Sequence, residues 1–169
     1  TLLLAGLDDA RAIAAMTRAL NSPHETGGAA HLPAASAGRV LSGADRAMTL
    51  IRVEGPAPSV ESRATALRAE LQEFGGAELL RGGAARQAWR ALADIAPCVD
   101  EPERVVWRVS IAPQVGPGVA AAVTRTLDAR FYYDWGGGLL WFAVAGAVDG
   151  GAAVVRAAIR EIGGHATLI

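Results

Sequence analysis

The feature that most constrains the fold of this chain is an internal repeat. Shifting the sequence by 88 positions aligns Arg68–Leu80 with Arg156–Leu168, and an arginine, an alanine, a glutamate, two glycines and a leucine coincide. A shift of 107 positions aligns Ala14–Leu20 with Ala121–Leu127, in the same order along the chain. A long-period repeat of this kind indicates one supersecondary unit that is written twice.

Hydrophobic periodicity and helix breakers give both copies the order strand, helix, two strands, helix, strand. The copies span about residues 1–81 and 104–169, and an amphipathic helix over 84–95 joins them. The expected strands are 1–5, 27–33, 48–54, 77–81, 104–112, 129–133, 138–145 and a last strand after 163–164, and the expected helices are 8–20, 59–74, 119–127 and 150–162. The sequence therefore predicts an α+β fold of two ferredoxin-like βαββαβ units that form one large antiparallel sheet. Helices are expected on one face of this sheet, which leaves the other face free.

Charge and composition exclude several classes of protein. The chain has 16 basic residues, all of them arginine, against 17 acidic ones, so no basic stripe is available for nucleic acid or an anionic membrane. Its apolar runs fall short of the roughly 18–20 residues of a transmembrane helix. The single cysteine cannot form an internal disulfide, and the three histidines have no metal-ligand spacing. We expect a soluble intracellular protein without a metal site.

Strand alternation places three side chains on the free face. Arg108 and Arg52 occupy the outward phase of strands whose inward positions are apolar, and aligning the end of the strand 138–145, whose own phase is ambiguous, with the end of 48–54 puts Trp141 outward as well. Two guanidinium groups beside a large ring suit a small carboxylate next to a flat ring system. The alternative is that Arg52 and Arg108 are simply solvated residues on an exposed sheet face.

Six of the nine aromatic residues lie between Phe131 and Phe142, around the turn glycines Gly136–Gly138. Such a hairpin predicts either an aromatic-walled site or a core segment with an interface. His165, which opens the last strand, is a weaker candidate for the same site. No nucleophile and no acid–base pair emerges, so the residues indicate a binding face without a catalytic centre.

The strings VWRVSIAP, ARFYYDWGGGLLWFAV and IGGHATLI resemble the C-terminal half of GlcE-type subunits of bacterial glycolate oxidase. These subunits belong to the vanillyl-alcohol-oxidase-type family of FAD-linked oxidoreductases. The resemblance covers essentially the whole chain and implies that residues 1–169 are a cap, or substrate, domain whose sheet faces the flavin. The FAD-binding domain of that family is absent from these residues, so the chain is expected to be a fragment. The H-x-G-D-G-N-x-H motif of related catalytic caps is absent as well.

The resemblance also implies a function, a cofactor and partners. The chain would cover the flavin of a 2-hydroxy-acid (glycolate) oxidase or dehydrogenase, and FAD would be held mainly by the missing domain, so the fragment alone would bind none and be inactive. A sister flavoprotein subunit and an iron–sulfur subunit would be partners, in the cytoplasm or peripherally at the inner membrane. The severed cap would tend to form a homodimer. Arg108, with Arg52, would bind the substrate carboxylate, and the flavin-facing residues would be Trp141, Tyr132, Trp135 and His165.

A second interpretation belongs to another class of protein. Tandem ferredoxin-like units also serve as regulatory or subunit-assembly modules that bind a small effector. In that case the aromatic hairpin would be a subunit interface. The sequence upstream of the fragment discriminates between the two, because only a cap domain follows an FAD-binding domain.

Overall fold

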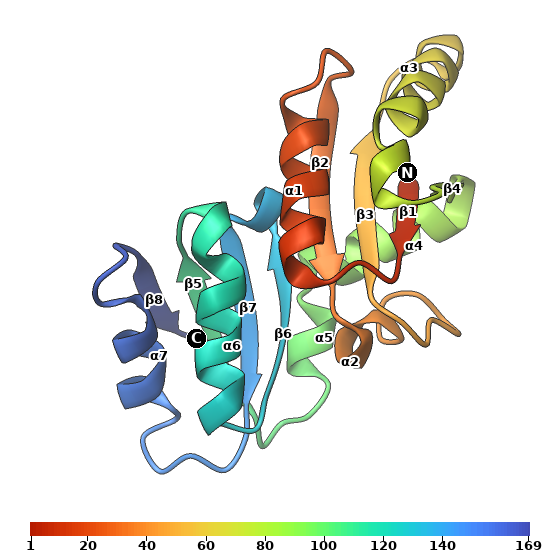
Figure 1. Cartoon of the computed structure of the whole chain (residues 1–169). Helices are drawn as coiled ribbons and strands as arrows, with labels where there is room; N and C mark the ends of the chain where they lie inside the picture. Colours follow the sequence, from red (N-terminus) through yellow and green to blue (C-terminus); the bar gives the residue numbers. More distant parts are fainter.

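The computed structural model describes the whole chain, Thr1–Ile169, which forms one eight-stranded sheet with helices packed on it (Figure 1). The first copy of the repeat contains β1 (Leu2–Ala5), α1 (Asp9–Leu20), β2 (Thr26–Leu32), β3 (Met48–Val53), α3 (Ala57–Glu70) and β4 (Glu78–Leu79). The second contains β5 (Val105–Ser110), α6 (Gly116–Thr126), β6 (Ala129–Asp134), β7 (Leu139–Val144), α7 (Ala152–Ile159) and β8 (His165–Leu168). Between them lie α4 (Gly82–Ala93) and α5 (Ala96–Val99), and the short helix α2 (Ala34–Ala37) interrupts the β2–β3 connection. Short 3₁₀ turns occupy Gln72–Phe74, Pro113–Val115 and Trp135–Gly137.

The strands are arranged in the order β4-β1-β3-β2-β6-β7-β5-β8, and each paired neighbour is antiparallel. In both halves the first strand is flanked by the third and the fourth, and the second lies beyond the third. This is the strand order of a ferredoxin-like unit. The predicted α+β fold, with two such units joined edge to edge, is therefore confirmed. The second strands of the two units, β2 and β6, form the join.

Helix α1 illustrates how local sequence produces these elements. It begins after Asp8, whose carboxylate accepts a hydrogen bond from the Arg11 N–H at 2.8 Å and so satisfies one of the free amides of the first turn. Its buried stripe recurs at helical spacing and consists of Ala12, Ile13, Ala15, Met16 and Ala19. Mostly small side chains on this stripe let the helix lie close to the sheet. None of the helices has the length and apolar character needed to cross a membrane.

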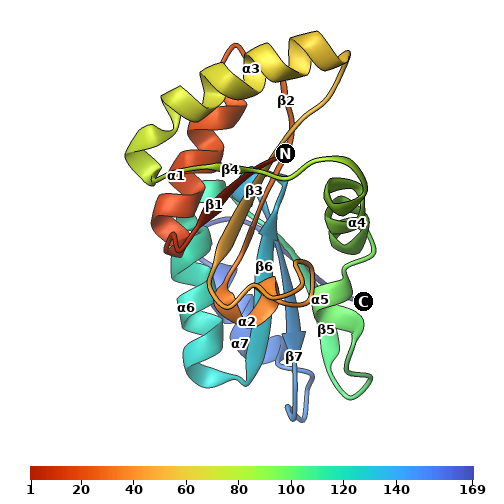
Figure 2. The same cartoon turned by 90° about the vertical axis from the view of Figure 1, so that its right-hand side faces the viewer.

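The two faces of the sheet are covered differently. The repeat helices α1, α3, α6 and α7 pack on one face, whose core holds 27 buried residues (Figure 1). The sequence predicted that the opposite face carries no helix. That prediction is wrong, because α4 and α5 lie against this face (Figure 2). Ala88, Leu92 and Cys98 of these helices belong to a second cluster of 11 buried residues on that face. Apolar side chains such as Leu50 and Tyr132 give this part of the sheet a surface that the amphipathic linker can bury.

The seam between the units rests on very little backbone pairing. Only His31 and Tyr133 are paired across β2 and β6. The buried His31 contacts the Thr49 hydroxyl through Nδ1 at 2.9 Å, and its Nε2 lies 3.4 Å from Oδ1 of Asp9. The Tyr133 hydroxyl donates to Oδ2 of Asp9 at 2.7 Å. Burial alone would raise the pKa of Asp9, but these contacts with His31 and Tyr133 hold it below its usual value.

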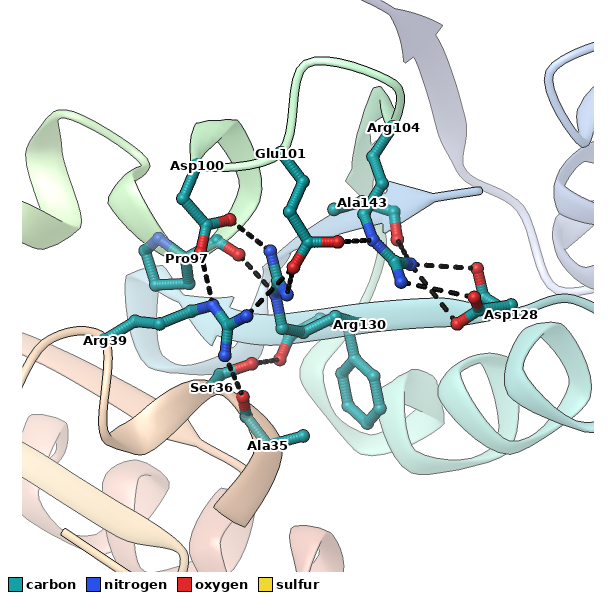
Figure 3. A network of polar contacts seen from close by, with 11 residues as sticks. Ala35, Ser36, Arg39, Pro97, Asp100, Glu101, Arg104, Asp128, Arg130 and Ala143 are labelled. Carbon is teal, nitrogen blue, oxygen red and sulfur yellow. Dashed lines mark hydrogen bonds and ion pairs between the residues drawn. The ribbon is translucent and has the colours of Figure 1, made fainter. Parts of the chain in front are cut away.

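A network of arginines and carboxylates strengthens the seam from the other face (Figure 3). Arg130 of β6 is nearly buried and donates to the Pro97 carbonyl at 2.6 Å, to Glu101 at 2.7 Å and to Asp100. Arg39, which follows α2 in the first unit, pairs with the same two carboxylates. The linker carboxylates therefore bridge the first unit and β6. Hydrogen bonds from Arg104 and Arg130 lower the pKa of Glu101 from 4.5 to about 2.

The β6–β7 turn also fastens the second unit to the first. Its residues Trp135, Gly136 and Gly137 all have positive φ, at 50°, 64° and 97°. A Cβ atom on Gly136 would lie 2.3 Å from Leu20 of α1, and one on Gly137 would lie 2.2 Å from Ile13. Positive φ favours glycine at both positions, and the buried Ile13 side chain constrains Gly137 further.

We expect Gly137→Ala to destabilise the protein by about 1–3 kcal/mol, because a Cβ there adds a clash with Ile13 to the cost of a positive φ. Urea unfolding measures the loss. Gly43→Ala is the matched control, since Gly43 has φ +80° and open space around its Cβ position. Equal losses in the two variants would mean that contact with α1 does not constrain the turn.

Glu101→Gln should lower stability in a pH-dependent way. Because the folded-state pKa of Glu101 is depressed, its contribution is fully present above pH 4.5 and is lost as the pH falls toward about 2. The difference in unfolding free energy between the wild type and the variant should shrink over that interval, as urea titrations at stepwise pH would measure. Glu103→Gln, at an exposed residue outside the network, is the matched control. A constant difference for Glu101→Gln would contradict this prediction.

Candidate functional site

The part of the second face that α4 and α5 leave open carries Arg108 and Trp141. They are direct cross-strand partners on β5 and β7, with side chains on the same face. Their outward phase follows from the alternation of β5, which turns Trp107 and Val109 into the core on the helix side. Hence the strand pattern read from the sequence places these two side chains as the structure does.

Trp135 completes this group from the β6–β7 turn. The Arg108 guanidinium lies over its ring, 5.4 Å from the centroid, and the Trp135 side chain is 66% exposed. The Asp134 carboxylate fixes the turn by accepting the Trp135 N–H at 2.8 Å. A non-glycine residue at positive φ is uncommon, and here it results in a large ring standing over the open face.

Arg108 and Trp141 are adjacent donors without acceptors in the chain. Arg108 makes no hydrogen bond and no ion pair with another residue, and the Trp141 Nε1 is buried without a hydrogen-bond partner. An unpaired buried indole N–H costs free energy, so most are paired in native structures. We call these two residues the Arg108–Trp141 donor pair. Beside the Trp135 ring, they form a site suited to an anionic, planar acceptor such as a carboxylate.

Arg52 lies on the same face but in a different environment. Its guanidinium stacks on Trp89 of α4, 5.0 Å from the ring centroid, and Nε lies 3.1 Å from the Glu54 carboxylate. Nη2 donates to the Gly27 carbonyl at 3.3 Å. The sequence groups Arg52 with Arg108, whereas the structure assigns it to the first unit and to Trp89.

Tyr132 and His165 occupy the margins of the open face. Tyr132 is fully buried beneath α4, and its hydroxyl donates to the Leu92 carbonyl at 3.1 Å. Burial raises the pKa of Tyr132 far above its usual value. His165 is exposed on the edge strand β8, paired with Ser110 rather than with Arg108. Of the six predicted site residues, the structure therefore brings together Arg108, Trp135 and Trp141.

Two residues near this site were not singled out from the sequence as site candidates. In the sequence, Trp89 is one apolar position of an amphipathic helix. The neighbouring residues do not indicate which strand residue its ring contacts. Asp134 reads as a turn residue, but burial raises its pKa, an effect that the Trp135 N–H and the charge of Arg52 partly offset. The sequence signal that could have identified Asp134 as a site residue was its position at the end of the strand, directly before Trp135.

The remaining reactive groups do not form a catalytic centre. Burial raises the pKa of the Cys98 thiol to about 12, so it stays protonated and unreactive. No group of three or more histidine, cysteine and acidic side chains is placed to hold a metal ion.

Comparison with known proteins adds no family assignment: no protein-family model matches this chain, and no curated protein matches it significantly. The fold and the open face define the chain as a tandem ferredoxin-like α+β protein with a donor-rich, aromatic-walled surface.

We expect Asp134→Asn to leave the fold intact and to raise stability near neutral pH. Burial raises the pKa of Asp134 in the folded state, so its ionised form opposes folding at higher pH, and this cost vanishes below about pH 3.8, the usual pKa of an aspartate. An asparagine oxygen can still accept the Trp135 N–H. Urea unfolding at neutral pH and near pH 3.5 tests the change, with the exposed Asp45→Asn as control. A loss of stability at neutral pH would contradict it.

Proposed function

We propose that this chain is the cap domain of an FAD-linked 2-hydroxy-acid oxidoreductase and that Arg108 binds the substrate carboxylate. The Arg108–Trp141 donor pair is the observation that carries the proposal, because two adjacent donors without acceptors call for an anionic ligand. The resemblance to GlcE-type subunits supplies the substrate class, glycolate or a related 2-hydroxy acid. The double ferredoxin-like sheet is compatible with the cap architecture of that family.

In this proposal the residues of the open face would contact a small acid that lies beside the flavin. The unpartnered Trp141 Nε1 and the Arg108 guanidinium would hold the carboxylate, with charge-assisted hydrogen bonds from Arg108. The exposed Trp135 ring would provide an apolar wall and exclude water from the substrate. The flavin, when bound by a neighbouring domain, supplies the hydride acceptor. This chain contributes binding and orientation.

In this proposal the chain works within a larger assembly. A sister flavoprotein subunit and an iron–sulfur subunit would receive the electrons, in the cytoplasm or at the inner membrane. The exposed Trp135 and the open part of the sheet would be covered there. Without such a partner, the same surface would favour a homodimer.

A second candidate function is a regulatory module that binds a small effector, and a separate cavity favours it. This cavity of about 800 Å³ lies in the first unit, between the loop 38–46, β1 and the start of α4. Its apolar residues include Leu3, Leu41 and Met48, whereas Arg46, Glu78 and Gln87 supply polar groups. Groups of both charge signs around an apolar floor suit a zwitterion such as an amino acid.

Titration of this chain with glycolate, lactate and free amino acids, followed by tryptophan fluorescence, tests the proposal. We expect the hydroxy acids to change the fluorescence, because Arg108 lies on the Trp135 ring. Arg108→Ala should weaken binding about 10-fold or more, as expected for losing a charge-assisted hydrogen bond of about 1.5–3 kcal/mol.

Trp141→Phe keeps a ring but removes the N–H and should weaken hydroxy-acid binding in the same direction. Arg160→Ala, at an exposed residue of the α7 end, is the matched charge control. Unchanged affinity in Arg108→Ala would refute the carboxylate role. A response to amino acids alone, unaffected by Arg108→Ala, would favour the regulatory module.

A further inference from the structure

A second concentration of positive charge lies in the first unit, away from the Arg108–Trp141 donor pair. It lines a cleft of about 710 Å³ between α4, the end of β3 and the start of α3. Four of the sixteen arginines of the chain line this cleft, whereas Glu54 is its single acidic lining residue. We call it the arginine cleft, and its arginines are Arg52, Arg81, Arg86 and Arg90.

The ion pairs of Arg81 and Arg90 are exposed and leave both side chains available to a ligand. Arg81 pairs with Glu61 and Arg90 with Asp94, at 3.1 and 3.0 Å, and all four side chains are at least 60% exposed. Exposed pairs of this kind contribute about 0–1 kcal/mol, so a more highly charged anion can displace them. Arg86 has no ion-pair or hydrogen-bond partner in the chain.

The walls of the cleft hold one of these arginines in place. The Arg52 guanidinium is fixed by the Trp89 ring, the carbonyl of Gly27 and the Glu54 carboxylate, which lies 3.1 Å from Nε. Arg86 and Arg90 are one helical turn apart on α4 and therefore project from the same side of the helix. Leu80, Val53 and Val60 add apolar surface.

We propose that the arginine cleft binds a small ligand that carries two linked phosphate groups. Guanidinium groups form bidentate hydrogen bonds with phosphate oxygens, and several of them around one cleft match a compact group with several negative charges. The volume is within the usual range of about 300–1,000 Å³ for small-molecule sites. The chain as a whole has a net charge of -1, so the cleft does not reflect a generally basic surface.

This site is independent of the proposed carboxylate site. Arg108 and Trp141 do not line the arginine cleft, and the four arginines of the cleft belong to the first unit and the linker helix α4. Either site can therefore fail its test without affecting the other.

Isothermal titration with inorganic pyrophosphate, orthophosphate and citrate tests the inference. We expect pyrophosphate to bind at least about 10-fold more tightly than orthophosphate, because only the diphosphate can engage several arginines at once. Citrate, which has similar charge but different geometry, should bind more weakly than pyrophosphate. Pyrophosphate binding should weaken as salt concentration rises.

Variants locate the binding. Arg86→Gln should weaken pyrophosphate binding several-fold, and the Arg86→Gln/Arg90→Gln double variant about 10-fold or more. Arg160→Gln removes an exposed, unpaired arginine outside the cleft and should leave the affinity unchanged. Thermal unfolding should be unaltered in all of these, because the side chains are exposed. No binding of pyrophosphate, equal binding of citrate, or equal losses in Arg86→Gln and Arg160→Gln would overturn the inference.

Discussion

The structure depends on a seam where two four-stranded halves share one backbone pair, His31 with Tyr133. The antiparallel ladders of β7 with β5 and with β6 each extend over six residue pairs, so their register is fixed by the backbone and by alternation. At the seam, contacts between side chains must supply the stabilisation that a single backbone pair does not provide. Tyr133 and His31 converge on Asp9 from the helix side, and Arg130 reaches the linker carboxylates from the other side. Both faces of the sheet thus hold the two halves together.

The seam also positions the candidate site. The strand that joins the halves, β6, continues directly into the turn that carries Trp135, and this turn packs against α1 of the first unit. Because Gly136 and Gly137 contact α1, the position of the Trp135 ring over Arg108 depends on how the first unit docks. A site made of second-unit residues is therefore held in shape by the first unit. This coupling gives the tandem arrangement a role beyond enlarging the sheet.

Much of this fold could be predicted from the sequence because its signals are local. The repeat of Arg68–Leu80 at Arg156–Leu168 and the alternation around Trp107 define the units and the strand phase without tertiary information. The cover on the second face could not be predicted in this way. An amphipathic helix reveals that it buries a stripe, yet its sequence does not say which face it meets. For that reason Tyr132, assigned to an open wall, lies under Leu92, and Arg52 stacks on Trp89.

Hydrogen-bond and ion-pair partners distinguish structural arginines from candidate site arginines better than the side of the sheet to which each side chain points. Arg130 and Arg104 both donate to carboxylate and carbonyl acceptors. These partners explain why Arg130 can be nearly buried. An exposed arginine without a partner is ordinary, because water solvates it. Arg108 differs because its cross-strand neighbour Trp141 also has an unpaired donor, in this case a buried one. Water solvates an exposed guanidinium, whereas the Trp141 indole N–H has no acceptor within the chain, so an external acceptor that reaches both donors would stabilise this protein.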